Sequence, residues 1–480
     1  MHQIYDFIQQ LEDKQIIILG LGREGMSTYE FFRKYLPTKH LWLIDEIGLA
    51  NLDDKWQEIS NADKNVSFSA HLDHPEIQET NGIIVFKTPG ISPQNKLFQQ
   101  VDELNASLSS NTDLFFTIID IINANLANDN KKVKTIGITG TKGKSTATSI
   151  IAHMLTTAGV HSYLGGNIGI APLSLIDVII DTAENNNSNY PVFAVLELSC
   201  HQLNDTLHSP NYAVVLDVTP EHLDYYKSFN EYVLAKSHIC KFQTENDFVI
   251  FDSEKYIPKK IAHMANATHL TFSYSRNISN NWITYQAEKV SDLNKVPLTG
   301  KHTINNALPA VIIAKHLGLS NQSISQALES FKSLPHRLEL IQEKDGISYY
   351  NDSLSTTPVA TIAAIESFNN NPIILIAGGF DRGLDYSELA QEIIDHQIKH
   401  LILLPDTGEI ILDEIKKRIN NNMGQLTFTQ VSSMKHAVRV AKEHAIDGDI
   451  VLMSPASASF NLFENYQDRG DQFRKFVNSE

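Results

Sequence analysis

The 480-residue chain has little cysteine and no long apolar run. Its two cysteines, Cys200 and Cys240, are too few for a disulfide framework or a cysteine metal cluster, so we expect a reducing compartment. The apolar run near the N-terminus, residues 16–21, is only as long as a strand, and no basic segment with an apolar signal core precedes it. No stretch approaches the length of a membrane span. These features predict a cytoplasmic protein that does not insert into a membrane.

Basic residues are scarce relative to acidic ones. Lys and Arg number 39 against 56 Asp and Glu, which gives a formal net charge of −17. A nucleic-acid-binding protein needs a basic face, so this balance argues against nucleic acid as a partner, and equally against an anionic membrane. A polyphosphate or acidic substrate would have to be held by local cationic sites that act against the global field.

What the chain does contain is a series of apolar, strand-length segments that alternate with helical ones. The length exceeds what one ordinary core accommodates, and 42% of the residues are hydrophobic. The alternation predicts an α/β protein whose sheets are mainly parallel and flanked by helices. We place three domains along it: a Rossmann-like nucleotide-binding domain at 1–106, a central P-loop domain at 107–333, and a Rossmann-like C-terminal domain at 334–480.

The most informative segment is 135–149, TIGITGTKGKSTATS. An apolar strand leads into a glycine loop at a helix N-terminus, where unpaired backbone N–H groups and the helix dipole attract phosphate. Lys144 is expected to reach the outer phosphates, and the Ser145 hydroxyl to sit on magnesium. A strand–turn–helix crossing without a ligand would explain the glycines but not the Lys-Ser-Thr that follows them. We therefore predict an ATP-type triphosphate site at Gly140, Thr141, Lys142, Gly143, Lys144, Ser145 and Thr146.

A second glycine loop occurs near the N-terminus, where Gly20, Gly22 and Gly25 follow a strand and fit the pattern G-x-G-x-x-G. Asp45, at the end of the next strand, has the spacing of an acid that contacts a ribose. Thr88 begins another loop at what we expect to be the same edge of the sheet, where ligands of such folds bind. Taken alone the pattern is weak, and the glycines could serve only tight packing between strand and helix.

Polar side chains follow two strands of the predicted central domain. Glu197 ends one of these strands, and a carboxylate beside a phosphate loop is where magnesium is held, although a surface acid would look the same. Beyond the next strand stands TPEHLD, with Glu221, His222 and Asp224; His222 could be a metal ligand or a hydrogen-bonded loop residue. Composition alone suggests that Lys236 packs its stem on apolar surface and keeps its head in water.

Arg337 follows a proline at the predicted join of the second and third domains. A guanidinium there could clamp phosphates or form an interdomain salt bridge. In the third domain, a small-residue loop at 454–459 is expected to open a helix directly.

Eight motifs occur in one order along the chain: GTKGKST, GNIG, LELSCHQL, TPEHLDYYKSFNEYVLAK, GKHTINNA, LPHRLE, NDSLSTTP and SPASASF. Together they resemble the Mur ligases of peptidoglycan synthesis, and within that family the branch that adds glutamate to UDP-N-acetylmuramoyl-L-alanine. The resemblance covers the whole chain. It implies an ATP-dependent ligase that converts the substrate carboxylate into an acyl phosphate, which the amine of glutamate then attacks. Magnesium would offset the crowding of negative charge.

The resemblance also assigns roles to individual residues. Lys144, His222 and Lys236 match catalytic positions, and Lys236 matches a carbamylated lysine, whose carbamate could ligate magnesium. The matching metal set is Ser145, Glu197, His222 and Lys236. Nucleotide contacts are implied for Asn306, Arg337 and Asp352. Substrate contacts are implied for Gly22, Arg23, Glu24, Gly25, Asp45, Thr88, Asn167, Ser199, Gln202, Thr356, Arg382, Ser459 and Tyr466. The implied partners are UDP-N-acetylmuramoyl-L-alanine, glutamate and ATP, and we expect a monomer.

Three positions depart from the family pattern. Thr303 stands where asparagine is common, and Leu354 and Arg382 stand where lysine is common. NDSLSTTP and DRGLDY look closer to the branch that adds L-glutamate, and lysine and arginine are not interchangeable at a carboxylate. The enantiomer is left open, with D-glutamate favoured because that activity is commoner in the family.

Two other functions compete with this interpretation. A folate-polyglutamate ligase would share the phosphate loop and the lysine but should lack a first UDP-binding domain. A nucleotide-gated binding module would close on ATP without chemistry and would not need Glu197, His222 and Lys236 together.

Overall fold

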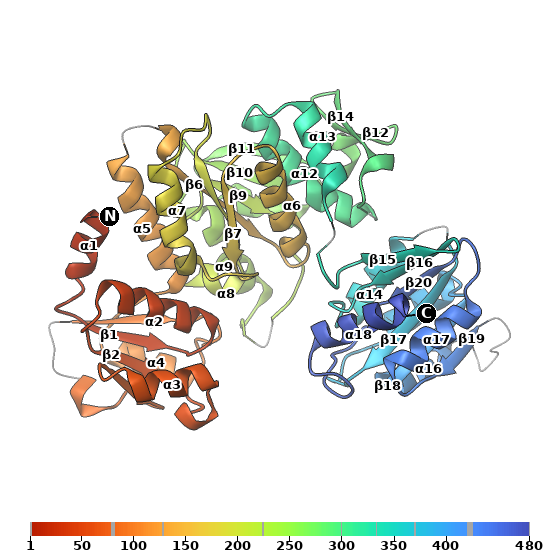
Figure 1. Ribbon diagram of the computed structural model, residues 1–480, viewed down its shortest axis with the longest axis horizontal. Helices are drawn as coiled ribbons and strands as arrows, with labels where there is room; N and C mark the ends of the chain where they lie inside the picture. Colours follow the sequence, from red (N-terminus) through yellow and green to blue (C-terminus); the bar gives the residue numbers. More distant parts are fainter. Residues whose placement is uncertain are drawn as a thin grey trace. The chain divides into compact units, whose positions relative to one another are not determined.

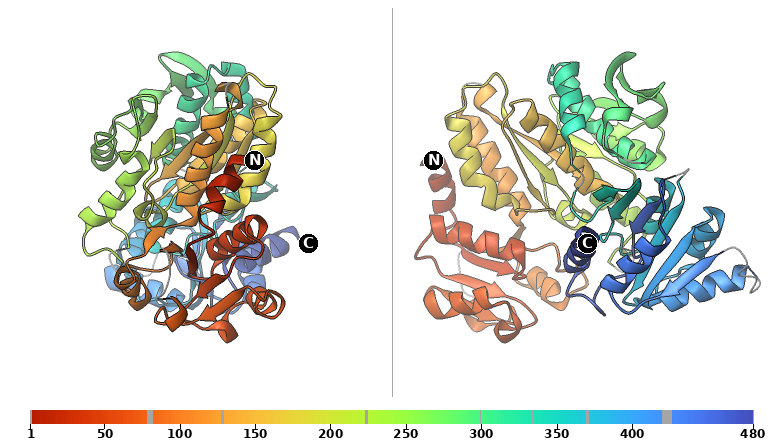
Figure 2. Two further views of the ribbon diagram at one scale, coloured as in Figure 1. Left: turned by 90° about the vertical axis from the view of Figure 1, so that its left-hand side faces the viewer. Right: turned by 45° about the vertical axis from the view of Figure 1, so that its right-hand side comes forward.

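The computed structural model describes residues 2–77, 82–126, 129–222, 225–298, 300–332, 334–368, 371–419 and 426–479. It divides into two compact units, Met1–Lys295 with Asn305–Glu329 and Val296–Ile304 with Ser330–Glu480. Helices cover the larger sheets of both units (Figure 1), and the same layering is visible from two further directions in Figure 2. The predicted α/β class is confirmed.

The first unit begins with a five-stranded sheet, here the N-terminal sheet, in the order β3-β2-β1-β4-β5, with every neighbouring pair parallel. Ile16 and Ile18 pack into a core with Phe32, whereas Ile17 and Leu19 pack with Leu97 in a separate core. A parallel strand buried on both faces needs apolar residues at every position, which is why 16–21 is a continuous apolar run. The strands are β1 Gln15–Leu19, β2 Leu41–Ile44, β3 Val66–Ser69, β4 Ile83–Lys87 and β5 Ser107–Ser109, and the helices α1 His2–Gln9, α2 Arg23–Tyr35, α3 Asp54–Ala62, α4 Lys96–Glu103 and α5 Asn111–Asn125.

The central sheet follows in the same unit, with six parallel strands in the order β11-β10-β9-β6-β8-β7. Strand β6 lies between β8 and β9, so the carboxyl ends of these strands meet at one edge. Its strands are β6 Val133–Thr139, β7 Ser162–Gly166, β8 Val192–Glu197, β9 Tyr212–Val215, β10 Phe248–Asp252 and β11 Thr268–Phe272. Its helices are α6 Lys144–Thr157, α7 Ile176–Glu184, α8 Cys200–Asn204, α9 Phe229–Lys241 and α10 Tyr256–Ala262.

A small antiparallel sheet, β12-β13-β14, comes after the central sheet. The sequence patterns did not indicate it, because its strands are short and only partly buried. The elements are α11 Tyr274–Asn277, β12 Ile278–Ser279, β13 Trp282–Tyr285, β14 Glu288–Asp292, α12 Lys301–His316 and α13 Asn321–Ser330. Among the described helices, none is both long and apolar enough to cross a membrane.

The second unit contains the C-terminal sheet, in the order β15-β16-β20-β17-β18-β19. The pair β15–β16 is antiparallel and the other pairs are parallel. The helix expected directly after 454–459 begins only at Tyr466, where Asn465 caps it by accepting a hydrogen bond from the Asp468 N–H. The strands are β15 Glu339–Lys344, β16 Ile347–Asn351, β17 Ile373–Gly379, β18 His400–Asp406, β19 Thr427–Gln430 and β20 Ile450–Met453, and the helices α14 Pro358–Glu366, α15 Ser387–Asp395, α16 Thr407–Arg418, α17 Met434–His444 and α18 Tyr466–Asn478.

Candidate functional site

The loop between β6 and α6 has the geometry of a phosphate cradle. Gly143 lies at φ +83°, a left-handed conformation that glycine adopts without strain, and Lys144 begins the helix. The Lys144 Nζ donates hydrogen bonds to the carbonyl oxygens of Gly140 and Thr141 at 3.1 and 2.9 Å. The ammonium therefore lies inside the loop. Of the other predicted loop residues, Thr146 is buried, Ser145 is half-buried and Lys142 is exposed.

Asn306, on α12, lies directly against this loop. A Cβ atom on Gly143 would come within 2.5 Å of both the Oδ1 and the Nδ2 of Asn306. Any residue other than glycine would therefore clash with the Asn306 amide in this position. The structure thus brings Asn306 to the phosphate loop from 163 positions further along the chain, a separation that no local sequence pattern bridges.

Lys236 is buried on α9 and points at the same loop. Its Nζ donates to the Gly140 carbonyl oxygen at 2.7 Å and lies 4.6 Å from the centre of the Tyr232 ring. Only 1% of the residue is exposed, so the composition-based interpretation, with the head in water, was wrong. Burial, reinforced by the positive charge of Lys144, lowers the pKa of Lys236 to about 7. A substantial fraction of this lysine is therefore a neutral amine at neutral pH.

Glu197 ends β8 next to the loop, since its partner in the sheet register is Ile138 of β6. It is 2% exposed, and its Oε1 accepts a hydrogen bond from the Asn167 Nδ2 at 2.8 Å. Its Oε2 is buried and has no hydrogen-bond partner among the described residues. A buried carboxylate oxygen without a hydrogen-bond partner is available to coordinate a hard cation. Because this oxygen lies beside the phosphate loop, the residues present fit a magnesium ion.

His222 lies in the loop after β9, at φ +56°. Its ring is 6.3 Å from that of Tyr232, which also contacts the Lys236 Nζ and, at 3.0 Å, the Thr141 hydroxyl. Tyr232 therefore connects His222, Lys236 and the phosphate loop. Asp224 lies outside the described residues.

The N-terminal glycine loop is shaped by close packing at two of its three glycines. A Cβ on Gly20, at φ +92°, would meet the Thr88 Oγ1 at 2.0 Å, and one on Gly25 would meet the Gly20 carbonyl oxygen at 2.3 Å. Gly22 has no atom within 4 Å of a built Cβ, so its side is open to a ligand. Asp45 accepts a hydrogen bond from the Leu21 N–H at 2.8 Å, which ties the loop to the end of β2.

Arg23 and Glu24 point from this loop toward the central sheet. The Arg23 guanidinium donates to the carbonyl oxygens of Gly166, Asn167 and Gly169 at 2.9–3.1 Å. The Glu24 Oε1 accepts from the Gln202 Nε2 at 2.7 Å, and burial raises the pKa of Glu24 to about 7. Sequence patterns gave no sign of these contacts. The adjoining hollow, of about 400 Å³, is lined in part by Gly22, Arg23, Ser27, Asp53, Trp56 and Ser174.

Gln202 also forms hydrogen bonds with Ser199, and the two residues make a capping box at the start of α8. The Ser199 N–H donates to the Gln202 Oε1 at 2.9 Å, and the Ser199 Oγ accepts from the Gln202 N–H at 3.2 Å. Both residues therefore carry structural hydrogen bonds in addition to their predicted substrate contacts.

A buried ion pair near these contacts was missed from the sequence. The Lys87 Nζ, at the end of β4, lies 2.5 Å from the Asp205 Oδ2 that follows α8, and both side chains are almost fully buried. Lys87 also donates to the Ile91 carbonyl oxygen at 3.0 Å. The pair links the N-terminal sheet to the central one, a relation between residues 118 positions apart that sequence patterns do not reveal.

Replacing Lys87 with methionine should lower the free energy of unfolding of the first unit by about 3–5 kcal/mol, because it leaves the Asp205 carboxylate buried and uncompensated. Urea denaturation measures the loss. The matched control is Lys55→Met, whose exposed pair with Glu30 should be worth about 0–1 kcal/mol. Equal losses in the two variants would show that the buried pair has no special role.

In the second unit, one arginine holds the two loops that carry the predicted glutamate-side residues Thr356 and Ser459. Arg469, on α18, is fully buried, and its guanidinium donates to the carbonyl oxygens of Ser353, Ser457 and Ala458 at 2.9–3.1 Å. Ser459 follows directly after this contact and is buried. Thr356 follows three positions after Ser353, while Arg382 is exposed on the loop after β17. Arg469 was not singled out from the sequence, where it looks like an ordinary helical surface residue.

Asp352 is buried at the end of β16, and its carboxylate is already satisfied. It accepts from the Ser454 Oγ at 2.7 Å and from the Leu338 N–H at 3.1 Å. Burial raises its pKa to about 6, against the lowering effect of these hydrogen bonds and of the Arg337 charge. The Tyr466 ring lies 6.1 Å from the His336 ring, and the Tyr466 carbonyl oxygen accepts from the Ser353 Oγ at 2.7 Å.

Replacing Arg469 with methionine should destabilise the second unit by about 3 kcal/mol or more. The Ala458 carbonyl oxygen keeps its hydrogen bond from the Phe380 N–H, but the Ser353 and Ser457 carbonyl oxygens lose the guanidinium, and each carbonyl left unpaired in a buried site costs about 1–3 kcal/mol. The matched control is Arg474→Met on the same helix, whose partly exposed pair with Glu339 should be worth about 1 kcal/mol or less. Thermal unfolding of both variants tests the difference, and equal shifts would remove the bracing role assigned to Arg469.

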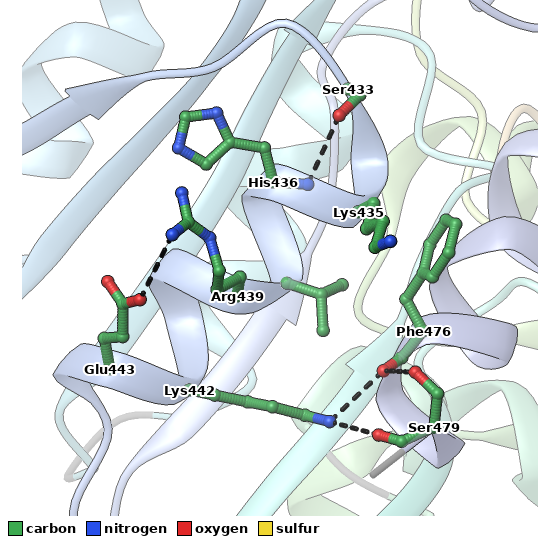
Figure 3. Close-up of a pocket in the computed structure, with 9 residues that line it drawn as sticks. Ser433, Lys435, His436, Arg439, Lys442, Glu443, Phe476 and Ser479 are labelled. Atoms are coloured by element: carbon green, nitrogen blue, oxygen red, sulfur yellow. Dashed lines mark hydrogen bonds and ion pairs between the residues drawn. The ribbon is translucent and has the colours of Figure 1, made fainter.

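A further hollow of about 500 Å³ lies between α17 and the end of α18 (Figure 3). Two of the positive groups that line it already have partners in the protein. The Lys442 Nζ donates to the Phe476 and Ser479 carbonyl oxygens at 3.2 and 2.7 Å, and Arg439 pairs with Glu443 at 3.8 Å. Within the described part of the chain, no predicted site residue lines this hollow.

Comparison with known proteins gives consistent matches along the chain. Residues 138–314 match the Mur ligase middle domain, and residues 336–457 match the Mur ligase, glutamate ligase domain. The chain is 30% identical over 478 residues to the UDP-N-acetylmuramoylalanine--D-glutamate ligase of Clostridium tetani, covering 98% of each chain. It is 33% identical over 485 residues to the protein of that name from Clostridium botulinum, covering 99% of this chain and 98% of the relative. Its fold is similar to that of the MurF ligase from Thermotoga maritima in complex with ADP, with a TM-score of 0.56 at 14% identity over 97% of this chain and 98% of that one.

Proposed function

The chain belongs to the Mur ligase family and is a ligase of peptidoglycan synthesis; on that premise we propose that it uses ATP to join D-glutamate to UDP-N-acetylmuramoyl-L-alanine through an acyl phosphate. The observation that carries the proposal is the meeting of Lys144, Lys236 and the unpaired Glu197 Oε2 at one phosphate loop. This set supplies cations for a triphosphate and an oxygen ligand for the metal that accompanies it.

Phosphorylation is needed because a carboxylate is a poor electrophile, and the phosphate gives it a leaving group. The oxygen of the alanine carboxylate attacks the γ-phosphorus of ATP, and ADP leaves. The amine of glutamate then attacks the acyl carbon, loses a proton, and expels inorganic phosphate as the amide bond forms. The Lys144 ammonium, released from the loop carbonyls it contacts at 2.9 and 3.1 Å, would hold the transferring phosphoryl group.

Ser145, Glu197, His222 and Lys236 are the residues we assign to magnesium, which when bound would screen the phosphate oxygens from the attacking carboxylate. A free lysine amine is a poor ligand for a hard cation, so we propose that Lys236 reacts with carbon dioxide to form a carbamate. Two features support this: the lysine is enclosed beside the loop, and part of its population is the neutral amine that the reaction requires. Enclosure also protects a carbamate from the water that would hydrolyse it.

The remaining predicted residues divide between the substrates. We assign UDP to the open side of the N-terminal glycine loop, where Gly22 leaves room and Asp45 and Thr88 stand near. We assign the nucleotide of ATP to Asn306, Arg337 and Asp352. We assign glutamate to the loops that carry Thr356, Arg382 and Ser459 and to Tyr466 at the start of α18. Because ATP is the energy source, we expect the protein to act in the cytoplasm, and we expect it to act as a monomer.

Three alternatives remain testable. The first is the same ligation with L-glutamate, which Leu354 and Arg382 favour because they replace lysines common in the family. A folylpolyglutamate-type ligase does not account for the five-stranded N-terminal sheet with its glycine loop. A nucleotide-gated module without chemistry does not account for a buried lysine and for a buried carboxylate oxygen without a partner among the described residues, both beside the phosphate loop.

A phosphate-release assay with UDP-N-acetylmuramoyl-L-alanine, run separately with D- and L-glutamate, tests the proposal. We expect release that depends on ATP, on the muramoyl substrate and on D-glutamate. Release with the L enantiomer alone would overturn the stereochemical assignment, and release with neither would overturn the ligation itself.

A further inference from the structure

Three side chains with nitrogen or sulfur ligand atoms meet beside the proposed magnesium residues. Cys200 and His201 begin α8, and His222 lies in the loop after β9. The Cys200 Sγ and one ring nitrogen of each histidine all lie within 4.8 Å of one another. The ring centres of His201 and His222 are 4.9 Å apart. Of the three, only His222 belongs to the set assigned to magnesium.

The chemistry of this cluster differs from that of the magnesium set. Magnesium prefers oxygen ligands and near-octahedral geometry, whereas one thiolate and two imidazoles are typical of zinc and its neighbours in the transition series. Three protein ligands with a water in the fourth position form a common tetrahedral zinc arrangement. With zinc–ligand bonds of about 2.0–2.3 Å, the ligand atoms would lie roughly 3.5 Å apart. The cluster would have to contract by about 1 Å, a movement that the partly exposed His222 side chain can supply by rotating.

A second observation points to a ligand at the same place. The Tyr226 hydroxyl is buried and has no hydrogen-bond partner among the described residues. It lies beside Cys200, whose thiol adds to the effect of burial in raising the pKa of Tyr226. The Tyr226 ring also stacks on the His201 ring, with centres 5.9 Å apart. An unpartnered donor beside a thiol can donate its hydrogen bond to a metal-bound thiolate, as outer-shell groups at metal sites commonly do.

We propose that Cys200, His201 and His222 form a site for a soft divalent metal ion of the zinc type, with the Tyr226 hydroxyl as its outer-shell donor. Binding displaces the thiol proton of Cys200 to solvent and leaves a thiolate on the metal. His222 belongs to both the proposed zinc-type site and the magnesium set. An ion bound by Cys200, His201 and His222 would therefore leave His222 unavailable to magnesium. Zinc would then inhibit ligation, a consequence that rests on the proposed function, whereas the site itself does not.

Cobalt(II) titration of the full-length protein in excess magnesium tests the site directly, because cobalt replaces zinc and a cobalt–thiolate bond gives a charge-transfer absorption band. We expect the band in the unmodified protein and its loss in Cys200→Ser. The matched control is Cys240→Ser, since the Cys240 Sγ donates to the carbonyl oxygens of Ser237 and Ile261 and should leave the band intact. His201→Phe should weaken zinc binding by at least about 100-fold, since even outer-shell groups are worth roughly 10–100-fold.

Absence of the band in the unmodified protein, or its persistence in Cys200→Ser, would overturn the site. In the ligation assay, Cys200→Ser should keep its basal rate and lose its sensitivity to zinc. A protein that binds cobalt through Cys200 but ligates nothing would overturn the proposed function and support the metal site.

Discussion

Replacing Lys236 with alanine is expected to lower turnover by about 10²–10³-fold, the range found when one group that stabilises developing charge is removed. The physical reason is the position of the Nζ, 2.7 Å from the Gly140 carbonyl oxygen in an enclosed site beside Glu197. As a carbamate this side chain would carry a negative charge to the metal, which alanine cannot do. Steady-state phosphate release measures the effect.

Chemical rescue of the alanine variant can show whether Lys236 acts as a carbamate or as an amine. If it acts as a carbamate, small carboxylates such as acetate or propionate should partly restore the alanine variant by entering the space left behind, while bicarbonate should not. If it acts as an amine, methylamine should restore the variant instead. Lys241→Ala, an exposed lysine on the same helix, is the matched control and should keep normal turnover. Normal turnover in Lys236→Ala would remove the metal-bridging role.

Replacing Lys144 with alanine is expected to weaken ATP binding by about 10–100-fold, because hydrogen bonds to charged groups contribute about 1.5–3 kcal/mol each. In the structure the Lys144 ammonium has the Gly140 and Thr141 carbonyl oxygens as partners, and a triphosphate offers stronger ones. Calorimetric titration with ATP and magnesium, without the other substrates, isolates the binding step. The control is Lys134→Ala on β6, which precedes the loop in the same strand.

An unchanged affinity in Lys144→Ala would mean that the glycine loop is only a tight crossing from strand to helix. Weaker binding in Lys134→Ala by the same factor would mean that the effect comes from the global charge of the protein and not from the loop.

The sequence predicted those features that depend on local periodicity. The segments 192–197 and 373–379 are strands as expected, because a buried parallel strand favours a continuous apolar run. Residues 133–139 also form the expected strand, with Val133, Ile136 and Ile138 buried. The position of Glu197 beside the phosphate loop also followed from strand order, since parallel strands present their carboxyl ends at one edge.

What the sequence could not predict depends on pairs of residues far apart in the chain. Lys87 ends an ordinary apolar strand, and only the fold shows that Asp205 is its partner. Arg469 looks like a surface residue on an amphipathic helix, and the sequence implied for Arg23 only a substrate contact, yet each arginine donates to several backbone carbonyl oxygens. No sequence periodicity indicates that an arginine will brace a loop in this way. The acceptors are backbone carbonyl oxygens, which are present in every sequence.

For Lys236, the helical sequence pattern and the fold give different positions of the side chain. Its apolar neighbours on the helix suggested a lysine with its head in water, because helical periodicity does not say which face meets the core of the neighbouring sheet. Resemblance to the Mur ligases implied instead a carbamylated lysine that ligates magnesium, and the structure buries the side chain. Its chemical state remains a prediction.

The claim on which the account depends is that the substrate carboxylate is activated by phosphoryl transfer. Supplying UDP-N-acetylmuramoyl-L-alanine with heavy oxygen in its terminal carboxylate, together with ATP and D-glutamate, tests this directly by mass spectrometry of the released phosphate. An acyl phosphate intermediate predicts one heavy oxygen in each inorganic phosphate formed, because the bond that breaks lies between the acyl carbon and that oxygen. Phosphate free of the label, formed alongside the amide product, would contradict the account.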